Sequence, residues 1–296
     1  MLLAFASLLL VIASYTVVKS VRDALFLSKF GITQLSLMAI GLALGVGFII
    51  TIYLRATSGT PRNRLIAGTN IVVIASLVLI RVGLESPGLA RILPWVLYVW
   101  SSVFGVFIVM QFWLLANDLF DPREAKRLFG FVGAGAILGG VTGGFIPGAL
   151  AGPLGTENLL LVSSGMLLLE AFLVMMVWPL RRQEEARPPR SKQEEGEKKK
   201  SGGGLAALKD SRVVRLLAAA LLLSTIATTL LDWQFKGIVK AAYAGRTDAM
   251  AAFFGSLYAY LSVASFFVQT LLTSNVLRRF GVGVGLMALP VSLLLG

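Results

Sequence analysis

The sequence contains no cysteine and no histidine among its 296 residues. These absences exclude disulfides, thiol nucleophiles, histidine acid–base catalysis and the usual ligands of zinc and haem. A catalytic site would then need clustered carboxylates, but the acidic residues outside the central charged segment are scattered along the chain. We therefore expect no enzyme activity, no catalytic residues, no metal site and no cofactor.

Charged residues are also scarce, at 14% of the chain, whereas hydrophobic residues make up 56% and the mean hydropathy is +0.82. This balance is typical of a polytopic membrane protein. The net charge of +12 would suggest nucleic acid in a soluble protein. In a membrane protein, however, Lys and Arg gather in cytoplasmic loops and attract anionic lipid. We expect the lipid bilayer as a partner and no nucleic acid.

Apolar windows of about 20 residues, long enough to span a bilayer as helices, recur along the chain. They lie near residues 2–25, 33–54, 65–84, 92–116, 128–151, 158–180, 213–238 and 249–273. The first lacks the charged start and cleavage site of a signal peptide, so we interpret it as a retained span. A ninth window begins near Val282 and is still apolar at Gly296, which suggests a fragment of a longer transporter.

One long polar segment, residues 181–212, divides these windows. It holds ten Lys and Arg, five Glu and one Asp, with too little apolar surface to offset the entropy of ordering. We predict a disordered linker; a nucleic-acid patch is the weaker alternative, because membrane-length segments flank it. The predicted domains are a six-helix bundle over 1–180, the linker over 181–212, and a truncated second bundle of three spans over 213–296.

The distribution of basic residues predicts the orientation. Nineteen of the 27 Lys and Arg residues lie in alternate polar segments on one side, eleven of them between Arg181 and Arg215. That side is predicted to be cytoplasmic, and the amino terminus and the linker lie on it. The expected location is a bacterial inner membrane. Six spans, a charged loop and further spans are the layout of a major facilitator bundle with twelve spans, of which about nine are present.

Ionisable residues within spans are costly and are therefore functional candidates. They occur in the first window, as Tyr15, Lys19, Arg22 and Asp23, and in the seventh, as Asp232 and Lys236. Either they face an aqueous cavity, or the cations snorkel to the outer headgroups. An acid beside a cation at matching places in both halves favours the cavity. We predict a cationic site for an organic phosphate, in which the two aspartates keep the cations ionised and pair with them when the site is empty.

Glu170 lies in the middle of the sixth window with no basic residue nearby in sequence. Such a carboxyl is either protonated, which suits proton coupling, or hydrogen-bonded to another helix, and both interpretations stay open.

The fifth window carries Gly135, Gly139, Gly140, Gly144 and Gly148. Their four-residue spacing predicts close helix packing and not a phosphate loop, which needs a strand-to-helix turn; Pro147 is predicted to bend this helix.

Polar residues are concentrated between the fourth and fifth windows, in the stretch FWLLANDLFDPREAKRLFG. The candidates for a cytoplasmic charge network are Asn117, Asp118, Arg123, Glu124, Lys126 and Arg127. The alternative is an ordinary solvated loop.

This stretch resembles the ATP/ADP translocase family, the nucleotide transporters of plastids and obligate intracellular bacteria. The resemblance lies in Phe112-Trp113, Ala116-Asn117-Asp118 and Glu124-Ala125-Lys126-Arg127, in the first-window stretch YTVVKSVRD, and in Asp232 with Phe235-Lys236. It implies ATP:ADP antiport by alternating access in twelve spans, with Lys19, Arg22, Asp232 and Lys236 at the substrate site. The family's plastid and parasite members have an acidic residue about where Ser101 or Ser102 falls here, so the substrate is left open. Some relatives carry soluble modules after the transporter, which predicts a fused C-terminal partner.

The leading hypothesis is a secondary transporter of nucleotides, with ATP/ADP exchange first. Four aromatic residues, Tyr15, Trp113, Trp233 and Phe235, are candidates for stacking on a base, although packing and interfacial anchoring are the commoner roles in spans. The alternatives are a transporter of another anion and a non-transporting membrane scaffold or sensor.

Overall fold

The computed structural model describes residues 2–56, 62–119, 122–184 and 212–268, and these are almost entirely helical. The long helices are α1 (Leu2–Lys29), α2 (Ile32–Ala56), α3 (Arg62–Gly83), α4 (Leu93–Leu119), α5 (Pro122–Leu154), α6 (Leu159–Glu184), α8 (Arg212–Ala242) and α9 (Thr247–Phe267). Two 3-10 turns, η1 (Leu89–Arg91) and η2 (Thr156–Asn158), precede α4 and α6. Each of the first eight predicted windows coincides with one of these helices. The ninth window and most of the linker lie outside the described residues.

Within the described residues, five segments are long and apolar enough to cross a membrane. They are Leu2–Lys29, Leu93–Met110, Gly133–Leu154, Thr156–Met176 and Thr247–Phe267. A shorter apolar helix covers Gly68–Gly83. The predicted all-helical, multi-pass membrane fold is therefore confirmed, whereas the count of nine spans and the facilitator arrangement stay predictions.

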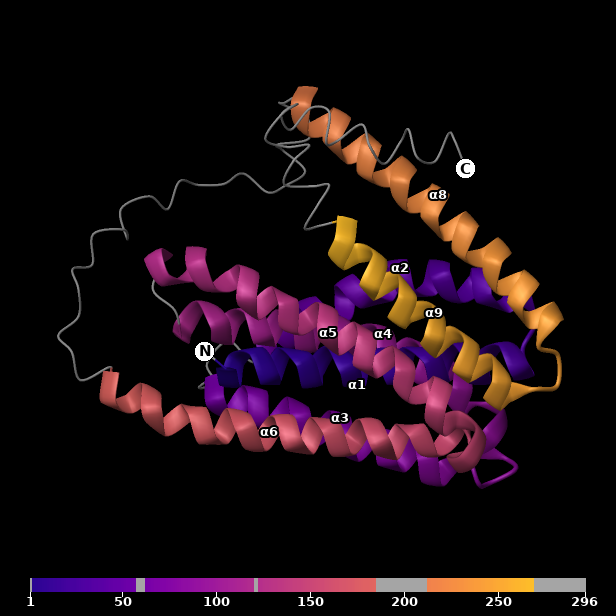
Figure 1. The fold of residues 1–296 in the computed structure, drawn as a ribbon. Helices are drawn as coiled ribbons and strands as arrows, with labels where there is room; N and C mark the ends of the chain where they lie inside the picture. The colour runs from indigo at the N-terminus through magenta and orange to yellow at the C-terminus, as the bar shows by residue number, and fades with distance from the viewer. Residues whose placement is uncertain (1, 57–61, 120–121, 185–211, 269–296) are drawn as a thin grey trace.

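Helix α1 lies inside the bundle, in contact with α4, α5, α6 and α9 (Figure 1). Its small and β-branched residues Val17, Val18, Val21 and Ala24 are fully buried. Because neighbouring helices surround α1, polar side chains on several of its faces meet protein instead of lipid. This placement allows one helix to carry two separate buried polar sites.

The glycines of α5 give this helix two close-packing faces. Gly135, Gly139 and Gly143 face α1, and Gly140, Gly144 and Gly148 face α9. A Cβ atom at Gly135 would lie 2.7 Å from the carbonyl oxygen of Phe5, and one at Gly144 would lie 2.6 Å from that of Gly255. The prediction of close packing is confirmed, and α5 holds α1 and α9 at a separation that only glycine permits.

Helix α8 contacts the bundle near its carboxyl end and diverges toward its Arg212 end (Figure 1). Lys236 and Val239 are buried, whereas Leu222, Leu223 and Leu230 are exposed. The acid–base pair of α8 thus lies where this helix meets α1.

Candidate functional site

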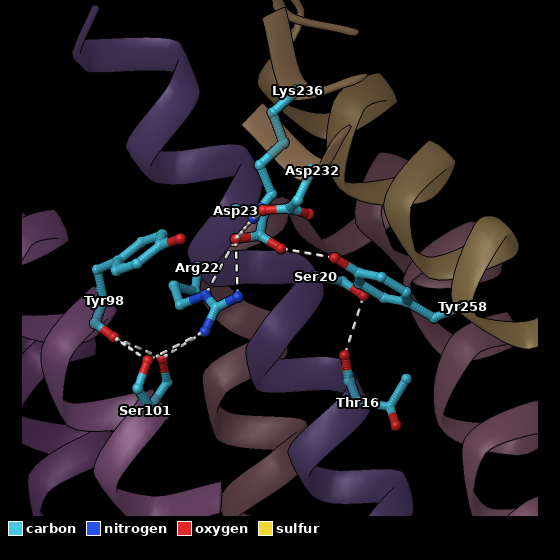
Figure 2. Close-up of polar contacts among 10 residues, drawn as sticks. Thr16, Ser20, Arg22, Asp23, Tyr98, Ser101, Asp232, Lys236 and Tyr258 are labelled. Atoms are coloured by element: carbon cyan, nitrogen blue, oxygen red, sulfur yellow. Dashed lines mark hydrogen bonds and ion pairs between the residues drawn. The ribbon is translucent and has the colours of Figure 1, made fainter. Parts of the chain in front are cut away.

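The carboxylate of Asp23 is the centre of a polar cluster that joins three helices (Figure 2). One oxygen, Oδ1, accepts from Arg22 Nε at 3.0 Å and lies 2.9 Å from Arg22 Nη2 and 3.4 Å from Lys236 Nζ. The other, Oδ2, accepts from the Tyr258 hydroxyl at 2.6 Å. Asp23 is only 1% exposed, so these partners replace the water that an ionised carboxylate would otherwise bind.

Arg22 extends from α1 toward α4. Its guanidinium lies over the ring of Tyr98, 4.4 Å from the centroid, and Nη1 donates to the hydroxyls of Ser101 at 3.5 Å and Ser102 at 3.4 Å. Both serine hydroxyls donate their protons to the carbonyl of Tyr98. Their oxygen lone pairs are therefore free to accept from Arg22. Arg22 therefore contacts the neutral hydroxyls of Ser101 and Ser102. At about this position the resemblance predicts an acidic residue.

Lys236 bridges the two aspartates. Its ammonium lies 2.8 Å from Asp232 Oδ2, one helical turn earlier on α8, and 3.4 Å from Asp23. The Lys236 side chain is buried, whereas that of Asp232 is 55% exposed. The predicted acid–base pair of the seventh window thus meets the charges of the first window.

Lys19 completes the cluster from the preceding turn of α1. Its ammonium lies 4.0 Å from the centroid of the Tyr258 ring, a cation–π contact. We call the residues that these contacts join the Asp23 cluster: Lys19, Arg22, Asp23, Tyr98, Asp232, Lys236 and Tyr258. It holds three cations and two carboxylates and therefore carries one excess positive charge. Electrostatic attraction is strong where water is excluded, so such a place favours an anion.

The structure therefore brings five of the predicted site residues together: Lys19, Arg22, Asp23, Asp232 and Lys236. Burial of the Arg22 side chain excludes snorkelling for this residue. Tyr15 lies two turns earlier on α1, where its ring packs edge-on against Phe104, with centroids 6.0 Å apart, and against Gly105. Tyr98 and Tyr258 were not among the predicted residues, because a neutral tyrosine in an apolar helix carries no charge signal.

The other aromatic candidates make packing contacts. The Trp233 indole donates to the carbonyl of Ile32 at 3.1 Å. Phe235 lies against Phe253 and Phe254, with ring centroids 6.2 and 6.5 Å away. The side chain of Trp113 lies outside the described residues. Stacking of these rings on a base stays a prediction.

The predicted cytoplasmic charge network spans the end of α4 and the start of α5. Its members Asn117, Asp118, Arg123, Glu124, Lys126 and Arg127 have backbones within these two helices. Their side chains lie outside the described part of the structure, so the network stays a prediction.

Glu170 lies in a second polar site, between α1, α3 and α6. Its Oε1 accepts from the Ser7 hydroxyl at 2.8 Å, and its Oε2 accepts from the Asn70 amide at 2.6 Å. Glu170 is 4% exposed. Of the two interpretations of Glu170, the hydrogen bond to another helix is observed, once with α1 and once with α3, whereas proton coupling stays a prediction.

The chain matches a known protein family. Residues 92–296 match the TLC ATP/ADP transporter family, and the matched part includes Tyr98, Asp232, Lys236 and Tyr258. No curated protein and no solved structure matches the chain. The family match covers more than half of the sequence and agrees with the membrane-length helices and the cationic cluster. The chain belongs to the TLC ATP/ADP transporter family.

Proposed function

We propose that the protein exchanges ATP for ADP across a bacterial inner membrane and binds the nucleotide phosphates at the Asp23 cluster. The observation that carries this proposal is the excess of cations over carboxylates in the Asp23 cluster: Arg22 and Lys236 pair with the two aspartates, and Lys19 adds a third cation over the Tyr258 ring. Phosphate oxygens would accept hydrogen bonds from Arg22, Lys236 and Lys19. Arginine suits this role because its planar fork binds phosphate through two parallel hydrogen bonds.

Asp23 contacts the same cations that a phosphate would bind. It contacts Arg22 through a hydrogen bond and an ion pair and Lys236 through an ion pair, and it accepts a hydrogen bond from the Tyr258 hydroxyl. A bound phosphate would compete with Asp23 for the two cations. Because Asp23 joins α1 to both α8 and α9, weakening its contacts would loosen α1 from these helices. Substrate binding would in this way favour a different arrangement of the two halves, as alternating access requires.

Two further sets of hydrogen bonds join segments before the linker to helices after it. Lys240 donates to the carbonyls of Leu27 and Phe30 at the end of α1. Asp248, in the first turn of α9, accepts from the backbone amide of Thr156 at 2.8 Å and from its hydroxyl at 2.6 Å. Together with the divergence of α8 at its Arg212 end, these contacts support an arrangement closed on one side and open on the other.

The proposed topology has a cytoplasmic amino terminus, a cytoplasmic linker and twelve spans. We place the amino terminus and the linker in the cytoplasm, because most Lys and Arg residues lie on that side. The closed side is then the outer one. Two six-helix halves, twelve spans in all, would surround the site, and a soluble module fused after the last span is an expected partner.

The test is nucleotide exchange by the full-length protein in liposomes, with labelled ATP outside and unlabelled ADP inside. Exchange that requires internal ADP is expected. The double variant Lys19→Gln with Lys236→Gln should reduce exchange to background, because only one cation of the site remains. Lys29→Gln is the matched control, since this exposed lysine contacts only the carbonyl of Ala90 among the described residues.

Two outcomes would overturn parts of the proposal. Full exchange by the double variant would exclude the Asp23 cluster as the phosphate site. A folded wild-type protein that exchanges no nucleotide would exclude ATP/ADP antiport and favour another anion.

A further inference from the structure

Glu170 is a buried ionisable group that phosphate binding does not use. The carboxyl and its partners Ser7 and Asn70 are each at most 4% exposed. Both carboxyl oxygens are hydrogen-bonded, at 2.8 and 2.6 Å, by neutral donors from two other helices. Among the described side chains, an ionised carboxylate here has donors but no counter-charge, which makes its charged form costly.

The ionisable side chains that the structure describes on the elements packed against α6 lie away from Glu170. On α1, Lys19, Arg22 and Asp23 follow Ser7 by 12 to 16 residues, or about 18–24 Å along the helix. On α3, Arg81 follows Asn70 by 11 residues, about 16 Å, and binds Asn158 and Glu85. The side chains of Arg62 and Arg64, at the start of α3, lie outside the described part of the structure. Glu157 of η2 precedes Glu170 by 13 residues, about 20 Å, and the α5 side chains that the structure describes, those of residues 133–154, include no ionisable group.

We propose that Glu170 is a proton-binding site through which this transporter couples nucleotide movement to a proton gradient. The proposal rests on the proposed function, because it needs a transport cycle to couple to. A proton is the ligand that this geometry suits: it neutralises the carboxyl without requiring further oxygen ligands. The Ser7 hydroxyl can also accept from a protonated carboxyl, so both protonation states keep their hydrogen bonds.

Helix α1 links this site to the phosphate site. It carries Ser7 at one end and Asp23 16 residues later, about 24 Å away. If phosphate loosens Asp23 from α8 and α9, α1 can shift relative to α6. Loss of the Ser7 donor would favour the protonated carboxyl, and its return would favour release of the proton. One proton would then be bound on one side of the membrane and released on the other in each cycle.

Glu170→Gln separates proton binding from a purely structural role. Glutamine has the same shape, and its oxygen can accept from Asn70 while its amide donates to the Ser7 hydroxyl. Unlike the carboxyl, it cannot titrate. The measurement is ATP accumulation in liposomes containing the full-length protein, with and without a more acidic outside solution. For one coupled proton, a gradient of about one pH unit should raise accumulation by up to about tenfold in the wild type.

The variant should lose this gradient dependence and keep exchange at equal pH on both sides. Glu170→Asp, which still titrates, should retain part of the dependence. Ser164→Ala is the matched control, because this buried hydroxyl on the same helix bonds the carbonyl of Leu160 and not Glu170. Gradient-dependent accumulation by Glu170→Gln equal to that of the wild type would overturn the proposal.

If Glu170→Gln fails to fold, a pH dye inside the liposomes provides a second measurement on the wild type. Acidification of the interior as ATP enters is expected, and its absence would overturn the proton site. A protein that exchanges ATP for ADP but ignores the gradient would refute this inference and leave the proposed function intact.

Discussion

Two buried carboxylates, Asp23 of α1 and Glu170, which contacts the other end of α1 through Ser7, differ in what surrounds them. Asp23 lies among two cations and a tyrosine hydroxyl, whereas Glu170 lies between a serine hydroxyl and an asparagine amide. Burial is nearly the same at both, at 1% and 4% exposure. The difference in counter-charge therefore decides what each site can bind. An anion could take the place of Asp23 beside its cations, whereas the described side chains around Glu170 include no cation, which favours a proton there as we propose.

The same difference predicts unequal costs of disruption. Removing one member of a buried ion pair leaves a charge without a partner, which typically costs about 3–5 kcal/mol. Removing a group that binds neutral donors leaves them unsatisfied, at about 1–3 kcal/mol. Variants at the two sites can therefore test whether the counter-charges distinguish them.

The largest effect is expected for Asp23→Asn. It leaves Arg22 and Lys236 buried without a carboxylate at the centre, and we expect a loss of about 3–5 kcal/mol in folding free energy. The measurement is thermal unfolding in detergent. Added ATP should stabilise the variant more than the wild type, because phosphate takes the position of the missing carboxylate. Equal stabilisation of both proteins would argue against phosphate binding at this cluster.

Gly143→Ala changes the position of the helix that both sites share. A Cβ atom at Gly143 would collide with the backbone of Ala13 on α1, and overpacking of this kind costs about 1–3 kcal/mol. We expect a lower unfolding temperature and slower ATP exchange. Gly133→Ala is the matched control, because a Cβ at Gly133 meets nothing within 4 Å. Equal behaviour of the two variants would contradict the close approach of α1 and α5.

The smallest effect on stability is expected for Glu170→Ala. Ser7 and Asn70 lose an acceptor but carry no charge, so we expect a loss of about 1–2 kcal/mol. The comparison with Asp23→Asn in the same unfolding assay tests the ranking. A greater loss at Glu170 than at Asp23 would show that counter-charge does not distinguish the two sites.

Much of the site was predictable because charged residues are conspicuous in apolar helices. Lys19, Arg22 and Asp23 in the first window and Asp232 and Lys236 in the seventh were expected to meet, and they do. The glycine spacing of the fifth window likewise predicted close packing. Tyr258, Ser7 and Asn70 were not predicted, since neutral polar residues are tolerated in spans and carry no comparable signal.

The sequence by itself determined where the helices lie and which positions carry charge, because apolar windows and ionisable residues are local properties. Only the tertiary structure decided which partner each carboxylate received. Tyr258 reaches Asp23 across 235 residues of sequence, and Glu170 reaches Ser7 across 163. The first pair forms because glycines of α5 let α1 and α9 pack closely against it, and the second because α6 packs against α1; neither packing arrangement is a property of a single window.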